Sequence, residues 1–388
     1  MSLVDQHRSR ELTESQREWL RVREYLQANR YELGQAAADL YPETLKVAGT
    51  PLLTRREWLP TEPIPLDAID LELASETPFA GLASDDPATA SLRPERSDGS
   101  RYSTYSAAMA DLAAPAVFEN RSTYRLLSAD LSGKRGRLVF GRGSYFDGIG
   151  LGEAVAHEYA AARLNGADTP LRNEIGDPCD PARRPTNLAI STLTVRHDPA
   201  TGDASFLLHW RDPAKVGHAG GLYMVIPVGI FQATDDQPWN ELNDFSLWRC
   251  IVREYAEELL GEPEDHGSGL APIDYDSWPL AADMTEELNR GGLRASALGI
   301  GVDPLTFATD VLTAIVFDAP LFDHLFGDLV HVNDEGALVS AGANGTSLPG
   351  FNLTEREVGR LVERGPMQSA GAAALALVWN ARDVMLEG

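Results

Sequence analysis

The stretch Arg253-Glu254-Tyr255-Ala256-Glu257-Glu258 governs the interpretation of this chain. In a helix, successive residues turn by about 100° around the axis. Glu254, Glu257 and Glu258 would then share one side with Arg253, while Tyr255 would lie among apolar neighbours on the other. Clustered carboxylates repel one another unless a cation or a basic group lies among them. Because Mg²⁺ prefers oxygen ligands, the pattern predicts an acidic helical face suited to a divalent cation.

The segments before this helix indicate a small sheet. Residues 187–196 and 205–211 are rich in β-branched and aromatic residues, and a turn with Pro and Gly at 199–203 separates them. Residues 220–232 form a third extended run, which Pro227 and Gly229 interrupt. The predicted order is therefore two strands, a third strand with Pro and Gly, a loop and the acidic helix.

Together these features resemble the Nudix hydrolases, whose signature is G-x5-E-x7-R-E-U-x-E-E-x-G-U. The resemblance extends over residues 187–265, and Ile226-Pro227-Val228-Gly229 is similar to the Pro-Gly-Gly turn that commonly precedes the signature. The loop half departs from the family pattern. Phe245 stands where the first glutamate belongs, Trp239 stands at the leading glycine, and Gly261 comes one residue late. Glu241 and Asp244 are the candidates for the missing loop carboxylate.

The resemblance implies metal-dependent cleavage of a nucleoside diphosphate linked to another group. Glu254, Glu257 and Glu258 would hold Mg²⁺ or Mn²⁺, which activates a water molecule for attack on phosphorus. Arg253 would position Glu257 or a neighbouring carboxylate. These four residues are the predicted catalytic set, and the general base is left unassigned.

Composition restricts the expected partners. The chain has 388 residues, 33 Lys plus Arg and 58 Asp plus Glu, and a net charge of −25, which disfavours direct nucleic-acid binding. A local basic pocket for a nucleotide-like small molecule remains compatible with this charge, and Arg183-Arg184 and Arg211 with Lys215 are candidates. Arg211 and Gly229 are the predicted substrate-binding residues. The resemblance also leaves a homodimer open.

The cysteines and the hydropathy indicate the compartment. Cys179 and Cys250 are the two cysteines, too few for a disulfide framework, and are expected to be buried, reduced thiols. No apolar run is long enough to span a bilayer, and no signal peptide is recognisable, so we expect a cytoplasmic protein without membrane contact.

The N-terminal part is predicted to be a mixed α/β accessory domain over residues 4–180. Helical spacing and a capping box at Thr13 predict a helix towards residue 40. Residues 44–71 are expected to be extended, and residues 74–115 to form a long loop or mobile connection. Strands are predicted at 121–130 and 137–140, followed by a helix at 151–164.

The pair His157-Glu158 in that helix invites comparison with the zinc-protease pattern H-E-x-x-H. Ala161 occupies the place of the second histidine. We therefore expect these residues to lie on a helix edge or in a domain contact rather than to bind a metal.

The Nudix-like domain is predicted to span residues 185–345, followed by C-terminal helices at 346–386 that pack back on it. Within it, residues 305–317 could be a buried strand or a helix, and residues 329–340 are expected to form a hairpin. Thr354 and Glu357 predict a capped helix, which Pro366 separates from an Ala-rich one.

The predicted fold class is α+β, with a Nudix-like α/β/α sandwich between an N-terminal mixed region and C-terminal helices. Two alternatives to the hydrolase stay open. A Nudix-like fold that has lost its chemistry could serve as a ligand sensor or regulatory protein. An ion-paired helix of this composition could also be a solvated surface of an acidic protein.

Overall fold

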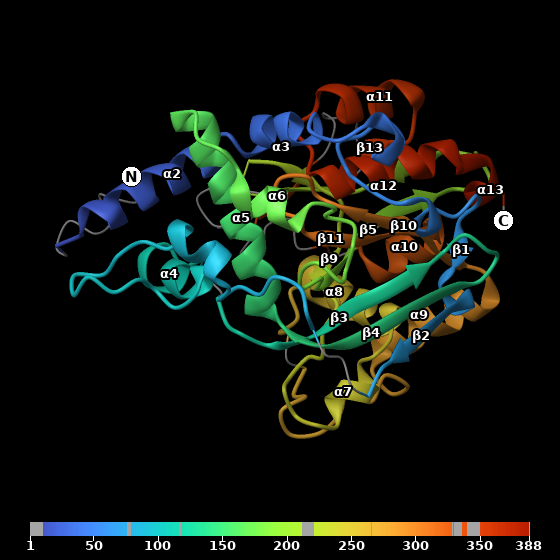
Figure 1. Ribbon diagram of the computed structural model, residues 1–388. Helices are drawn as coiled ribbons and strands as arrows, with labels where there is room; N and C mark the ends of the chain where they lie inside the picture. The colour runs from blue at the N-terminus through green and yellow to red at the C-terminus, as the bar shows by residue number, and fades with distance from the viewer. Residues whose placement is uncertain are drawn as a thin grey trace.

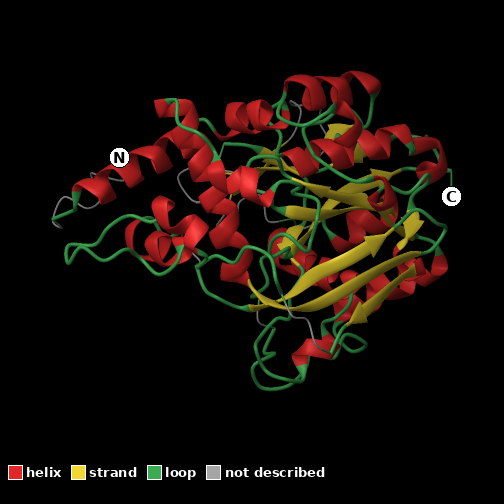
Figure 2. Cartoon of the chain, viewed as in Figure 1, coloured by secondary structure: helices red, strands yellow, loops and turns green. Residues whose placement is uncertain are grey.

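The computed structural model describes residues 11–75, 79–115, 118–211, 221–264, 266–327, 329, 336–339 and 350–387. It has mixed α and β structure, with helices and three sheets interleaved along the chain, which confirms the α+β class (Figures 1 and 2). The helices are α2 (Glu14–Ala28), α3 (Arg30–Ala38), α4 (Tyr105–Leu112), α5 (Tyr145–Asn165), α6 (Pro170–Ile175), α7 (Asn240–Asn243), α8 (Leu247–Leu260), α9 (Pro279–Arg290), α10 (Ala319–Leu325), α11 (Glu355–Arg364), α12 (Ser369–Asn380) and α13 (Arg382–Leu386).

A seven-stranded sheet forms the centre of the molecule. Its strands, in spatial order, are β1 (Ile64–Pro65), β10 (Leu293–Val302), β11 (Thr309–Asp318), β5 (Leu188–His197), β6 (Ala204–Phe206) and β13 (Phe351–Asn352), and β9 (Val228–Ile230) also pairs with β5. The pairing of β5 with β11 is parallel over ten residues, and the other pairings in this sheet are antiparallel. Residues 309–317 of the apolar run at 305–317 form β11, and burial of this strand on both faces explains their apolar character.

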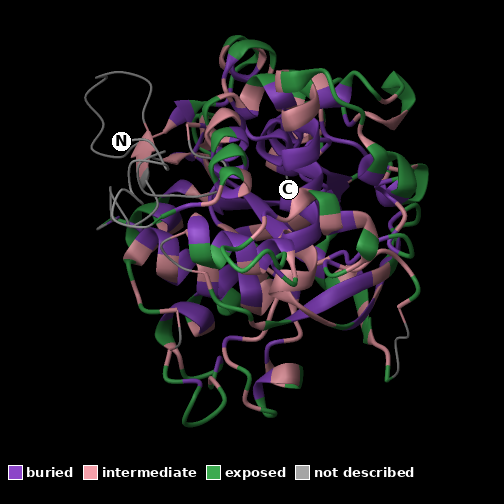
Figure 3. Ribbon diagram, turned by 60° about the vertical axis from the view of Figure 1, so that its left-hand side comes forward, coloured by how far each residue is buried: buried purple, intermediate pink, exposed green. Residues whose placement is uncertain are grey.

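Helices pack on both faces of this sheet. Side chains alternate along β5, so Leu188 and Ile190 join the core beneath α8, whereas Leu193 and Val195 join the core beneath α12. Helix α9 packs on β10 beside α8, and α12 crosses β5, β10 and β11. Figure 3 shows these inner surfaces as buried. Helices α8 and α9 thus lie on one face of the central sheet, and α12 lies on the other.

Two smaller sheets complete the β structure. One contains β12 (Gly336–Val339), β7 (Leu208–Arg211) and β8 (Tyr223–Met224), and the other contains β2 (Ile69–Leu73), β4 (Gly136–Ser144) and β3 (Ser122–Asp130). The second packs into the same core as α8, because the ring centroids of Tyr124 and Phe140 lie 4.7 and 5.2 Å from that of Phe231. The N-terminal part and the later part thus share one hydrophobic core.

The segment 74–115 is more ordered than expected. Its described residues include a 3-10 helix at Pro87–Leu92 and helix α4. Thr104 caps α4, and Tyr105, Ala108, Met109 and Leu112 are buried at helical spacing. The prediction of a long loop was wrong here because the Ser-, Ala- and Asp-rich composition concealed this short amphipathic pattern.

Other boundaries also shift. The first predicted helix breaks at Asn29 into α2 and α3, and α5 begins at Tyr145 through a capping box between Ser144 and Asp147. The run at 220–232 divides into β8 and β9, with a cis peptide bond before Pro227. The predicted hairpin at 329–340 falls largely outside the described residues, and its described strand β12 pairs with β7.

Candidate functional site

Helix α8 is fixed at both ends by its own sequence. The Ser246 side chain accepts a hydrogen bond from the Arg249 backbone N–H, and Gly261 ends the helix in the left-handed conformation at φ 69°. Its apolar side is buried, and the Tyr255 hydroxyl lies 2.7 Å from Thr194 Oγ1 on β5. These contacts determine which side of the helix carries the glutamates.

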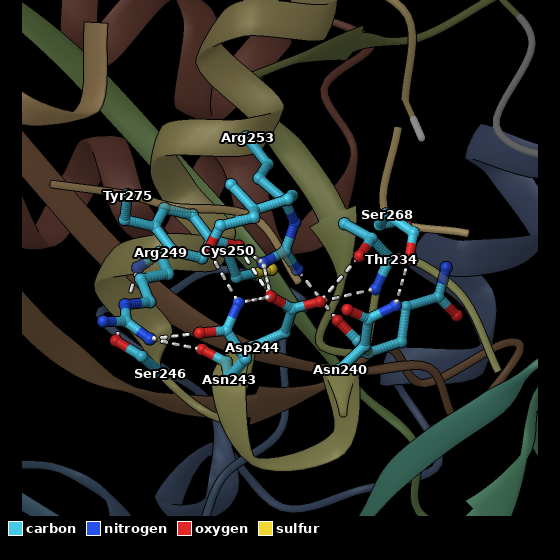
Figure 4. A network of polar contacts seen from close by, with 12 residues as sticks. Thr234, Asn240, Asn243, Asp244, Ser246, Arg249, Cys250, Arg253, Ser268 and Tyr275 are labelled. Carbon is cyan, nitrogen blue, oxygen red and sulfur yellow. Dashed lines mark hydrogen bonds and ion pairs between the residues drawn. The ribbon is translucent and has the colours of Figure 1, made fainter. Parts of the chain in front are cut away.

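Arg253 lies at the centre of a buried polar network (Figure 4). Its Nη1 donates to the Tyr275 hydroxyl at 2.7 Å and its Nη2 to the Gln232 carbonyl at 2.8 Å. The Tyr275 hydroxyl donates in turn to Asp244 Oδ1 at 2.8 Å, and Arg253 Nη1 lies 3.6 Å from the same oxygen. Arg253 is therefore buried and contacts Asp244 of the preceding loop, where the sequence predicted that it positions Glu257 or a neighbouring carboxylate.

Both carboxylate oxygens of Asp244 accept hydrogen bonds. Besides Tyr275, its carboxylate accepts hydrogen bonds from the backbone N–H and the hydroxyl of Thr234, at 2.9 and 2.7 Å from Oδ2. Burial alone would lower the pKa of Arg253, but Cys250, Tyr275 and Asp244 around it raise the pKa above its ordinary value. The Arg253 guanidinium therefore stays charged inside the protein, and its contact with Asp244 ties the loop to α8.

Two of the three glutamates lie against successive residues of β9. The Glu258 side chain is buried, and its Oε1 accepts a hydrogen bond from the Val228 backbone N–H at 2.8 Å. The Glu254 carboxylate packs onto Gly229 so closely that a Cβ atom there would lie 2.0 Å from Glu254 Cδ. The lack of a side chain at Gly229 is thus what admits Glu254, and it places Gly229 beside the acidic face.

Glu257 lies half-buried on the same turn of α8. All three glutamates belong to one helical face, as predicted, and carboxylate oxygens suit Mg²⁺ or Mn²⁺. In the described part of the chain, however, no three His, Cys, Asp or Glu side chains are grouped so that they could hold a metal ion. The donor chemistry fits a hard cation, but the three carboxylates do not meet as one ligand group in this structure.

Arg211 is placed differently from Gly229. It ends β7 in the three-stranded sheet with β8 and β12, and its Nη1 contacts Met224 Sδ at 3.6 Å. Gly229 belongs to the central sheet. The two predicted substrate-binding residues therefore come from different sheets. Lys215 lies outside the described residues.

The other basic candidates have structural partners. Arg183 donates to the carbonyls of Glu174 and Ile175 at the end of α6. Arg184 is buried, and it donates to the Pro178 carbonyl and to Thr309 Oγ1. Both side chains fix the segment between α6 and β5. This structural role explains the two arginines without a phosphate ligand.

His157 and Glu158 are both buried in helix contacts. The His157 ring stacks on Trp19 at 5.7 Å, and burial, together with Arg23, lowers its pKa to about 3. The Glu158 carboxylate accepts hydrogen bonds from the Leu171 and Arg172 backbone N–H groups at the start of α6. They join α2 and α6 to α5 within the predicted N-terminal region, so they lie in buried helix contacts and not on a helix edge or between the two predicted domains.

Sequence reasoning missed several residues of the network. Asp244 was a candidate for the loop carboxylate, and it stands one position before the family's glutamate. Tyr275 and Thr234 gave no recognisable signal, because they reach Asp244 from distant loops. Glu241, the other loop candidate, forms a two-bond ion pair with Arg142 of β4, at 2.5 and 2.8 Å.

Comparison with known proteins gives no matching family model and no significantly similar curated protein. Within the described residues, no helix combines the length and the hydropathy that crossing a membrane requires. Cys179 and Cys250 are free and buried, as expected.

Proposed function

We propose that the chain is a Nudix-like hydrolase that cleaves a nucleoside diphosphate linked to another group, and that the acidic face of α8 is its reaction face. The observation that carries the proposal is the contact between Arg253 and Asp244. This contact joins the arginine of the helix to a carboxylate of the preceding loop, and the sequence pattern has no glutamate at the loop position where the family has one.

The arrangement around this contact supports the proposal. The order β9, loop, α8 matches the order of the signature, and α8 lies against β5 and β9 of a sheet with helices on both faces. The network around Asp244 ties the preceding loop to α8, and Glu254 and Glu258 of α8 lie against the backbone of β9. These residues position the acidic face. Because the three carboxylates form no ligand group in this structure, binding of Mg²⁺ or Mn²⁺ would require their side chains to turn towards one point. An ion held there would supply charge neutralisation and an activated water.

A second candidate is a Nudix-like protein that binds a nucleotide-like ligand without cleaving it. The hydrogen bond from the Val228 N–H to Glu258, and the packing of Glu254 on Gly229, favour it. Both contacts give the carboxylates a structural task that does not require catalysis.

The experiment is a panel of nucleoside diphosphate sugars, dinucleoside polyphosphates, NADH and ADP-ribose, incubated with protein and millimolar Mg²⁺ or Mn²⁺. Phosphate-containing products that Glu257→Gln fails to form support the hydrolase. A compound that raises the melting temperature without being cleaved supports the second candidate. If no compound of the panel is cleaved and none raises the melting temperature, both candidate functions are contradicted.

A further inference from the structure

Two segments beside the network form a projecting lobe, residues 233–246 and 262–278, which we call the acidic lobe. It contains α7 and the loops beside it, and it extends from the body of the molecule in Figure 1. Trp239 Nε1 and Asn240 Nδ2 both donate to the Ser268 carbonyl, at 3.1 and 3.2 Å, and Asn243 Nδ2 donates to the Ile273 carbonyl at 3.0 Å. The two segments are therefore bonded to each other, as Figure 4 shows in part.

The tip of this lobe exposes large apolar side chains. Trp239, Leu242 and Leu270 are 42, 71 and 92% exposed, and they are three of the five exposed large hydrophobic residues within the described chain. Trp239 and Leu242 are three residues apart at the start of α7, so they share a side. Leu270 is two residues from Ser268, which bonds to Trp239. A group of this kind on an ordered lobe is typical of an interaction surface.

The charge of the lobe determines which occupant fits. Its two segments contain nine Asp and Glu residues and no Lys or Arg, and one of the nine, Asp244, is buried against Arg253 and does not contribute to the surface. Arg142 of β4 and Arg121, which precedes β3, contact Glu241 and Glu264 of the lobe. Two copies that met lobe to lobe would bring like charges together, and each copy carries a net charge of −25. A basic polypeptide complements this surface.

We propose that the acidic lobe docks a basic segment of a partner protein, with apolar side chains of that segment packed against Trp239, Leu242 and Leu270. Trp is the residue type most enriched among the dominant contacts of protein interfaces. The surrounding carboxylates would attract the basic residues and set the salt dependence of association. This docking surface is separate from the acidic face of α8.

The test is fluorescence anisotropy at about 0.15 M salt, where the screening length is about 8 Å. The probe is a labelled amphipathic peptide of leucine and lysine, and its control has glutamate in place of lysine. The parent should bind the lysine peptide and not the glutamate peptide. Leu270→Ser and Trp239→Ser should each weaken binding by about tenfold or more. Leu270→Ser is the decisive variant, since its side chain is almost fully exposed and the fold should tolerate the change.

Leu40→Ser and Val384→Ser are the matched controls, because these exposed apolar residues lie outside the lobe. Both should bind like the parent. Equal affinity of all four variants would overturn the proposal and leave only general attraction to an acidic protein. Absence of binding by the parent would also overturn it. So would a parent dimer in sedimentation that Leu270→Ser dissociates, because the lobe would then bind a second copy of the chain.

Discussion

Arg253 Nη1 of α8 lies 3.6 Å from Asp244 Oδ1 of the preceding loop, and both side chains are buried. The pair joins the loop half and the helix half of the acidic segment through a single ionic contact, which Tyr275 and Thr234 complete with hydrogen bonds. Because removal of one member of a buried pair leaves the other charge uncompensated, this contact is a sensitive point of the fold.

Asp244→Asn is therefore expected to lower the free energy of unfolding by about 3 kcal/mol or more. The measurement is urea unfolding at neutral pH. The matched control is Glu241→Gln in the same loop, which breaks the solvent-exposed pair with Arg142 and should cost about 1 kcal/mol or less. Equal losses in the two variants would show that the Arg253 pair has no special structural role.

Gly229→Ala tests the position of the Glu254 carboxylate. The new Cβ would collide with the end of the Glu254 side chain, which can move aside, so the carboxylate should be displaced at small cost to stability. We expect Mn²⁺ affinity to fall several-fold while the free energy of unfolding changes by about 1 kcal/mol or less. Gly359→Ala on α11 is the control, since nothing lies within 4 Å of its Cβ. An unchanged Mn²⁺ affinity in Gly229→Ala would show that the Glu254 carboxylate does not bind the cation.

Asp310 predicts a pH dependence of stability. It is buried on β11, Ser191 donates to its Oδ1, and burial, with a contribution from Asp303, raises its pKa from 3.8 to about 6. Between about pH 4 and pH 6 the Asp310 carboxyl thus keeps its proton in the folded protein and has lost it in the unfolded chain. The free energy of unfolding therefore falls as pH rises from about 4 to about 6. Two pKa units correspond to about 3 kcal/mol.

Asp310→Asn should remove this part of the pH dependence and stabilise the protein at pH 7 relative to the parent. Urea unfolding of both proteins at pH 4, 5, 6 and 7, about one unit apart, provides the measurement. A difference between the two proteins that stays constant across this range would contradict the raised pKa.

The sequence predicted the elements whose pattern is local. The apolar stripe of α8, the capping residues Thr13 and Thr354, and the strand at Leu188–His197 follow from spacing that short segments contain. The acidic face of α8 was predicted for the same reason. Helix α4 was missed because its eight residues lie within a segment of loop-like composition.

The parts that could not be predicted depend on contacts between distant segments. Glu258 and Arg253 looked exposed because their neighbours in sequence are polar, yet Val228 and Gln232 of the β9 region bury and bond them. Tyr275 likewise reaches Asp244 from a loop beyond α8. No periodicity within one segment encodes such pairings, since they arise only when the sheet and the loops assemble.

The most direct test of the central claim is calorimetric titration of the protein with Mn²⁺, compared across three proteins. The parent should bind with saturation, Glu257→Gln should bind about tenfold more weakly or not at all, and Glu355→Gln, an exposed glutamate of α11, should match the parent. If the parent gives no binding heat, or if Glu257→Gln binds like the parent, the acidic face of α8 is not a cation site and the hydrolase proposal fails.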